Sequence, residues 1–155
     1  MIKNSNTFYN KIINEANKFA KIGVKYKHRG TTINGCDCTG LLICVAKNIG
    51  YMNKFKLRNY SLDWNLHSGA GDYIIQGLNK IGEEIPKSTT QPGDILVFKF
   101  GRCDAHIGIL VNDDLFVHSY FEAKKCKYGR LKNSDWFKRW TRTFRLDENK
   151  MLQYN

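Results

Sequence analysis

The stretch Gly35-Cys36-Asp37-Cys38-Thr39-Gly40 runs directly into the apolar segment Leu41-Leu42-Ile43-Cys44-Val45-Ala46. A turn-rich loop before an apolar run predicts a helix that begins near Cys38, with Asp37 or Thr39 as its N-terminal cap. The first helical turn carries unpaired N–H groups and the positive end of the helix dipole, and both lower the pKa of a thiol placed there. The stretch therefore predicts either a reactive thiol at Cys38 or a buried cysteine beside a helix start.

The composition is typical of one globular domain that spans residues 1–155, with its core over about residues 8–146. Hydrophobic residues make up 42% of the 155 residues and aromatic residues 13%, which excludes global disorder. No apolar run approaches the roughly 20 residues of a membrane span. The segment from Met1 to Thr7 lacks the apolar core of a secretory signal. We therefore expect a soluble protein that is made in the cytosol, or carried elsewhere by another agent.

The formal net charge of +11 predicts a polyanionic partner, and nucleic acid, an anionic cell wall and a membrane face all qualify. Much of the excess lies late in the chain, at Lys124, Lys125, Lys127, Arg130, Lys132, Lys138, Arg139, Arg142 and Arg145. The sequence has no zinc finger, RNP-like run or continuous basic helix, so the charge alone does not indicate a specific nucleic-acid reader. A solvated basic face that aids solubility is the alternative.

Some of the cysteines could form a metal site, but their spacing disfavours one. Five cysteines are an odd number, which argues against a disulfide framework. Cys36, Cys38, Cys103 and His106 could supply four zinc ligands, but the one-residue gap in the first pair is tighter than the usual two to four. We therefore expect no metal and no other cofactor. Cys36 is either a redox partner of Cys38 or a packing residue, and Cys44 belongs to the core.

The hydrophobic pattern places helices first and strands afterwards. Apolar residues at helical spacing predict helices over residues 7–21, 38–50 and 71–81, with an irregular segment at 51–69. Alternating apolar residues then predict strands over 95–100, 106–111, 115–120, 124–131 and 141–146, with a short capped helix at 134–139. This order indicates an α+β fold in which an antiparallel sheet packs on the helix that begins at Cys38.

Two histidines on neighbouring predicted strands could serve a nucleophilic thiol. A thiol needs a base, and the base needs a group that holds its tautomer. If residues 112–114 form a three-residue loop, His106 and His118 lie on one face of the sheet as diagonal neighbours, with Cβ atoms about 7–8 Å apart. A two-residue loop would place them on opposite faces. The alternative for His106 is a core histidine whose ring is satisfied by a backbone carbonyl.

Four segments, taken in order, resemble the NlpC family of bacterial cell-wall cysteine peptidases, which are circularly rearranged relatives of papain. These segments are Asp37-Cys38-Thr39-Gly40-Leu41, Pro92-Gly93-Asp94-Ile95-Leu96-Val97-Phe98, His106-Ile107-Gly108-Ile109 and Phe116-Val117-His118. Further details resemble the short versions encoded with the tail genes of phages and gene-transfer agents: Tyr26-Lys27-His28-Arg29-Gly30, Gly35-Cys36-Asp37-Cys38, Tyr60-Ser61-x-x-Trp64 and Trp136-x-x-Arg139 with Phe144-Arg145. The resemblance covers residues 10–146.

The resemblance implies a role for each matching residue. Cys38 would be the nucleophile, His106 the general base and His118 the residue that orients His106, while the backbone N–H of Cys38 would contribute to the oxyanion hole. Tyr26 matches a tyrosine whose hydroxyl faces the catalytic cysteine. Asp37 matches an acidic position that meets the amino end of the substrate. Thr39 stands where the family usually has serine. This replacement keeps the hydroxyl but narrows the substrate subsite.

The implied activity is hydrolysis of peptidoglycan stem peptides, at the bond from γ-D-glutamate to a diamino acid. The implied partners are stem peptides and phage or gene-transfer-agent tail proteins, with delivery in a virion or to the periplasm. Three alternatives stay open at this point. One is an amidase or acyltransferase of the same fold, another is a non-catalytic tail or wall-binding module, and the third is a nucleic-acid binder that acts through its net charge.

Overall fold

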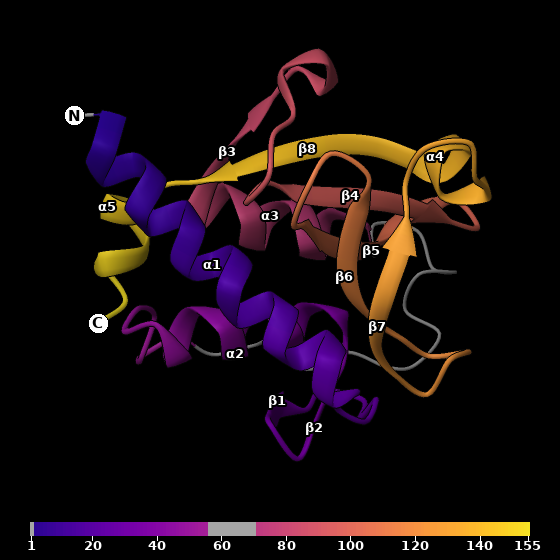
Figure 1. Cartoon of the computed structure of the whole chain (residues 1–155), viewed down its shortest axis with the longest axis horizontal. Helices are drawn as coiled ribbons and strands as arrows, with labels where there is room; N and C mark the ends of the chain where they lie inside the picture. The colour runs from indigo at the N-terminus through magenta and orange to yellow at the C-terminus, as the bar shows by residue number, and fades with distance from the viewer. Residues whose placement is uncertain (1, 56–70) are drawn as a thin grey trace.

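The computed structural model describes residues 2–55 and 71–155, and these form the predicted α+β arrangement (Figure 1). The first part contains α1 (Ile2–Ile22), β1 (Thr31–Thr32), β2 (Gly35–Cys36), α2 (Cys38–Asn48) and α3 (Gly71–Ile81). The second part contains β3 (Gly82–Ile85), η2 (Lys87–Thr89), β4 (Ile95–Phe100), β5 (Cys103–Leu110), β6 (Leu115–Tyr120), β7 (Lys125–Arg130), α4 (Asp135–Arg139), β8 (Trp140–Leu146) and α5 (Glu148–Leu152).

The six longer strands form one antiparallel sheet in the order β3-β8-β4-β5-β6-β7. Helices α1 and α2 pack against β5 and β6, α1 also reaches β7, and α3 packs against β5 and β8. The prediction of an antiparallel sheet packed on the helix that begins at Cys38 is confirmed. Within the described ranges, none of the helices combines the length and apolar character that crossing a membrane requires.

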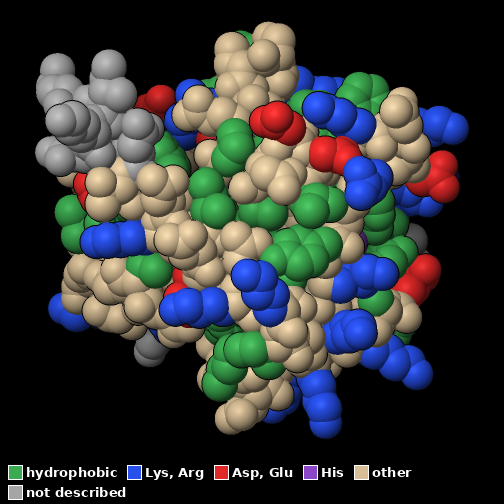
Figure 2. All heavy atoms as spheres, viewed as in Figure 1, with side chains coloured by type: hydrophobic (Ala, Val, Ile, Leu, Met, Phe, Trp, Pro, Cys, Tyr) green, Lys and Arg blue, Asp and Glu red, His purple; other side chains and the backbone are tan. Residues whose placement is uncertain are grey.

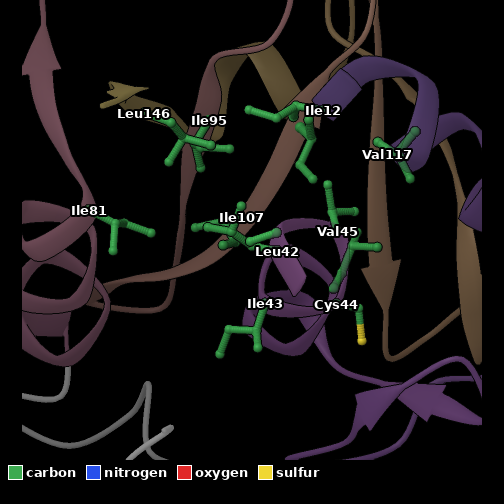
Figure 3. Close-up of a cluster of buried hydrophobic side chains, with 14 of the residues drawn as sticks. Ile12, Leu42, Ile43, Cys44, Val45, Ile81, Ile95, Ile107, Val117 and Leu146 are labelled. Atoms are coloured by element: carbon green, nitrogen blue, oxygen red, sulfur yellow. The ribbon is translucent and has the colours of Figure 1, made fainter. Parts of the chain in front are cut away.

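One face of the sheet forms the main core with the helices. Ile107 of β5 and Val117 of β6 lie in this core with Ile12 of α1 and Val45 of α2 (Figure 3). These four side chains and that of Ile109 are buried. Because side chains alternate across a strand, the residues between them face the other side of the sheet. That second face carries a smaller buried cluster around Leu96, Phe98, Leu110, Phe116 and Leu131. The two predicted histidines belong to this second face.

Several elements differ from the predicted boundaries. Strand β5 begins at Cys103 rather than at residue 106, because the pairing with β4 continues past an irregularity in its register. Between α1 and α2 the chain forms β1, β2 and two isolated bridges, and the apolar pattern predicted none of these. Strand β3 was not predicted, because its sequence GEEI has too few apolar residues and forms a strand only by pairing with β8. The Tyr60 and Trp64 motif lies outside the described residues.

The turn Pro92-Gly93-Asp94 anchors the start of β4. The carboxylate of Asp94 is fully buried, accepts the backbone N–H of Gln91 at 2.9 Å and receives two hydrogen bonds from the Arg145 guanidinium at 3.0 and 2.9 Å. A buried carboxylate needs such partners, because an uncompensated charge in the interior is costly. The pair therefore joins the turn before β4 to β8.

Glycines allow the backbone before α2 to pack against the start of this helix. A Cβ atom on Gly40 would lie 1.8 Å from the carbonyl oxygen of Gly30, and one on Gly30 would lie 2.4 Å from the carbonyl oxygen of Gly35. Contacts of this kind leave no room for any side chain. The loop and the first turn of α2 therefore form one packed unit, which fixes the position of Cys38.

We predict that Gly40→Ala lowers the free energy of unfolding by about 3 kcal/mol, because backbone must move to admit the methyl group. The matched control is Gly77→Ala in α3, where an added Cβ meets no atom within 4 Å. That substitution should raise stability by about 0.5–1 kcal/mol, since alanine favours a helix interior over glycine. Denaturant unfolding monitored by circular dichroism measures both, and equal stability of the two variants would contradict the packing described above.

Candidate active site

Asp37 begins the helix that carries Cys38. Its Oδ1 accepts the backbone N–H of Gly40 at 2.8 Å and the hydroxyl of Thr39 at 3.2 Å, and its Oδ2 accepts the backbone N–H of Arg29 at 2.8 Å. Of the two predicted caps, the structure therefore selects Asp37. Burial raises the pKa of this carboxyl, and the same hydrogen bonds oppose the rise. The carboxylate fixes the first turn of α2 to the preceding loop.

Burial is the main influence on the pKa of the Cys38 thiol and raises it to about 12. The nearby charge of Asp37 adds to this rise. Hydrogen bonds from the backbone of Ile107, Thr39 and Cys38 itself oppose it. The expectation that the helix terminus would lower this pKa is therefore wrong, because desolvation of the thiolate outweighs the dipole. The contact with Ile107 also places the sulfur beside β5, next to the peptide unit that follows His106.

Tyr26 also lies near the thiol. Burial raises the pKa of its hydroxyl, and the neighbouring charges of Asp37 and Cys38 raise it further, so all three groups lie close together. The backbone N–H of Tyr26 donates to the carbonyl of Lys124 at 2.9 Å, and its ring meets the exposed ring of Phe121 edge to face, with centroids 5.4 Å apart. The predicted proximity of Tyr26 to Cys38 agrees with this arrangement.

The two histidines lie on one face of the sheet and share a hydrogen bond. Ile109 pairs with Val117 across β5 and β6, which makes residues 112–114 a three-residue loop. His106 therefore lies diagonally from His118, as predicted for a loop of that length. Nε2 of His106 lies 2.8 Å from Nδ1 of His118. The nitrogen of His106 that this bond leaves unused is Nδ1.

Aromatic rings enclose the histidine pair and keep it neutral. Burial lowers the pKa of His106 well below its usual range and lowers that of His118 to about 3. The indole of Trp136, from α4, stacks on His106 at 5.5 Å and meets His118 edge to face at 5.0 Å. The other rings within 6 Å of one or both imidazoles are those of Phe98, Phe100, Phe116 and Tyr120.

This aromatic enclosure was not predicted, although its signal is present in the sequence. Phe116 and Tyr120 alternate with residues of the opposite face along β6, so the period of two places them on either side of His118. Gly108 and Gly129 flank the ring of Phe116 on the neighbouring strands, and a Cβ atom on either would lie within 2.6 Å of that ring. Small residues at these two positions therefore admit Phe116 beneath the histidines.

A groove of about 180 Å³ opens between α2 and α3, and it is lined in part by Thr39, the residue after Cys38. Two of its lining residues, Thr39 and Ile107, also donate backbone hydrogen bonds to the Cys38 sulfur. The rest of the lining is mostly apolar: Leu42, Ile43, Met52, Phe55, Tyr73, Ile74, Gln76, Gly77, Leu78, Lys80 and Ile81. An elongated substrate that reaches Cys38 can therefore extend into a partly apolar channel.

The structure separates the four residues considered as zinc ligands. The buried Cys36 sulfur lies 3.6 Å from that of Cys126 in β7 and also contacts Cys44 in α2, so it packs among core thiols. Among residues 2–55 and 71–155, no cluster of three or more histidine, cysteine or acidic side chains could hold a metal ion. Cys36 and Cys44 are core residues here.

Residues 23–145 match the model of the NlpC/P60 family, and the chain belongs to this family. It is 27% identical over 97 residues to a protein of Escherichia coli strain K12 named murein DD-endopeptidase MepS/murein LD-carboxypeptidase. The match covers 63% of this chain and 43% of the relative, so the chain corresponds to less than half of that protein.

Solved structures of the family share the fold. A lipoprotein-like NLP/P60 protein of Staphylococcus aureus superposes with a TM-score of 0.63 at 20% identity, over 91% of this chain and 42% of the other. The NlpC/p60 domain of the peptidoglycan hydrolase SagA gives 0.60 at 19% identity, over 89% of this chain and 98% of that domain. RipB of Mycobacterium tuberculosis, a peptidoglycan hydrolase, gives 0.62 at 17% identity, over 94% and 68%.

We predict that neither imidazole gains a proton between pH 8 and pH 5, since burial lowers both pKa values. Trp136→Ala admits water to the pair and should raise both pKa values toward 6.5, so that the rings titrate within this range. Phe137→Ala, which removes an exposed ring from the same helix, should leave them unchanged. Histidine NMR titration measures this. Titration near pH 6.5 in the unmodified protein would contradict the enclosure.

Proposed function

We propose that this chain is a cysteine endopeptidase that hydrolyses the stem peptides of peptidoglycan. Two observations carry the proposal: the bonded pair of His106 and His118, and the contact of the Cys38 sulfur with the backbone of Ile107, the residue that follows His106. A base held by a second polar ring, next to a nucleophile, is the arrangement that acyl transfer requires. Membership of the NlpC/P60 family supports the same reaction class.

In the proposed reaction, the Cys38 thiol gives its proton to Nδ1 of His106 as the sulfur attacks the carbonyl carbon of the scissile amide. The resulting oxyanion accepts the backbone N–H of Cys38, and its collapse expels the amine, which takes the proton from His106. A thioester then joins Cys38 to the acyl half of the substrate. Water attacks this thioester with His106 again as base, which releases the acid and restores the thiol.

The proposed reaction requires one tautomer of each histidine, and the bond between the two rings is compatible with this choice. For Nδ1 of His106 to accept the thiol proton, the ring must carry its hydrogen on Nε2, and that N–H then donates to Nδ1 of His118. His118 in turn carries its hydrogen on Nε2. The second histidine therefore holds the first in its basic form and orientation, as the third member of a triad does.

The raised pKa of Cys38 defines how the nucleophile forms. At neutral pH the resting thiol is protonated and both imidazoles are neutral. The thiolate must therefore form as the substrate arrives, when His106 removes the proton during attack. Backbone N–H groups already directed at the sulfur, from Ile107 and Thr39, stabilise the developing negative charge.

For the scissile bond, we propose the linkage from γ-D-glutamate to a diamino acid such as diaminopimelate. The negative charge of Asp37 and the hydroxyl of Tyr26 lie beside the thiol, where they favour a free amino group on the acyl side. The methyl group of Thr39, which lines the adjacent groove, narrows the space left for the substrate. The E. coli relative is named for different bonds of the same polymer, so the bond must be identified by product analysis.

We further propose that the protein acts with a phage or gene-transfer-agent tail. The support is the likeness of residues 26–30 and 35–38 to the tail-encoded versions of the family. Proteomic analysis of purified particles from a producing strain tests this association. Detection of the chain at a fixed copy number per particle would support it, and absence from the particles would oppose it.

We predict that Cys38→Ala lowers the turnover of purified muropeptides by at least roughly 10³-fold, because the reaction loses its nucleophile. Cys103→Ala is the matched control, since it removes a buried thiol that no step uses. It should retain activity near that of the unmodified protein. Mass spectrometry of the products measures both variants. Equal activity of Cys38→Ala and the unmodified protein, or no activity of the latter on any stem peptide, would refute the proposal.

A panel of muropeptides identifies the bond. We predict that the protein releases the diamino acid portion from stems whose first residue carries a free amino group, and that blocking this amine by acetylation lowers kcat/KM by about tenfold or more. The reason is the loss of attraction to the buried Asp37. Cleavage of a D-alanyl cross-link with no effect of acetylation would assign the other specificity instead.

A further inference from the structure

Six exposed lysines gather at one end of the sheet. Lys21 lies in the last turn of α1, Lys25 and Lys27 follow in the next segment, and Lys124, Lys125 and Lys127 lie at the start of β7. Figure 2 shows Lys and Arg side chains spread over the face that carries α1 and β7. We refer to these six residues as the lysine row.

The backbone holds two of these charges directly opposite each other. Lys25 and Lys125 are partners in an antiparallel bridge, flanked by hydrogen bonds from Tyr26 to Lys124 and from Cys126 to Val24. Directly opposed residues of an antiparallel pair point to the same face, and like charges there are destabilising. Lys127 lies two residues further along β7 and therefore on that same face.

The surrounding carboxylates do not neutralise the row. Within residues 2–55 and 71–155, no carboxylate lies within 4 Å of any of the six ammonium groups. Glu15 pairs instead with Lys18, and Glu122, the acid in the turn before β7, accepts the hydroxyl of Tyr120 at 3.0 Å. The fold thus places unpaired charges of one sign together, which an anionic ligand would relieve.

The row adjoins the candidate active site. Lys127 pairs with His118 across β6 and β7, and its charge contributes to the lowered pKa of that histidine. Lys25 and Lys27 flank Tyr26, which stands beside the thiol. A polymer bound along the row would therefore lie close to Cys38.

We propose that the lysine row binds a linear phosphodiester polymer of the cell wall, such as a poly(glycerol phosphate). The charges are spread along two segments rather than gathered around a cavity, which suits an extended polyanion better than a small anion. All six are lysines, which act as point charges and lack the planar fork that arginine uses for bidentate recognition of bases and phosphates in nucleic acids. The choice of a wall polymer rests on the proposed function.

The test uses Cys38→Ala protein, which binds without cleaving. It is sedimented with Gram-positive cell walls that carry poly(glycerol phosphate) and with the same walls after that polymer has been removed. We expect binding at low salt that falls steeply as salt is raised and that is largely lost with the polymer. Adding Lys21→Gln, Lys25→Gln and Lys125→Gln together should weaken binding by about 100-fold.

The matched control adds Lys11→Gln, Lys54→Gln and Lys99→Gln, which remove the same charge from exposed lysines elsewhere. It should weaken binding by less than about fivefold. Equal loss in both triple variants, binding that survives removal of the polymer, or tighter binding to duplex DNA than to the walls at 150 mM salt would each overturn the inference.

A parallel assay separates this inference from the proposed function. The unmodified protein and the lysine-row triple variant, both with an intact Cys38, are assayed on soluble muropeptides, which carry no polymer. If the unmodified protein cleaves them but shows no polymer-dependent wall binding, the inference fails and the proposed function stands. If it binds the polymer but cleaves no muropeptide, the proposed function fails and the binding surface stands.

Discussion

The hydrogen bond between the His106 and His118 rings is the interaction on which the candidate site depends. It exists because a three-residue loop between β5 and β6 sets a register that places both rings on the same face of the sheet. Nε2 of His106 then lies 2.8 Å from Nδ1 of His118. A shift of one residue would send one ring into the main core. The loop, the strand pairing and the chemistry are thus parts of one constraint.

Burial then determines the electrostatics of the site. The aromatic enclosure, with Trp136 as its outer wall, keeps both imidazoles neutral, and the packing of the helix start keeps the Cys38 thiol protonated. A neutral thiol and neutral imidazoles avoid the cost of burying separate charges. Charge separation is left to the moment of attack, when substrate and backbone N–H groups can stabilise it.

Much of this arrangement could be predicted from local patterns in the sequence. The apolar periods predicted three helices and five of the sheet strands. The shared face of the histidines was predicted only for a three-residue loop, and the sequence left a two-residue loop open as the alternative. The lowered thiol pKa was wrongly predicted, because a helix terminus is visible in sequence while desolvation depends on how distant segments pack around Cys38. Trp136 was quoted only as part of a motif, since its contact with the histidines arises from tertiary packing of α4. Strand β3 depends likewise on its partner β8.

In the proposed reaction, the Cys38 sulfur forms a covalent bond to the acyl half of a stem peptide. Rapid-quench mass spectrometry of the intact protein during turnover of a defined muropeptide, followed by peptide mapping, detects this bond. We predict a transient mass increase equal to the acyl fragment, located on the peptide that contains Cys38. Turnover without any adduct under conditions where hydrolysis of a thioester is slowed, or an adduct on another cysteine, would contradict it.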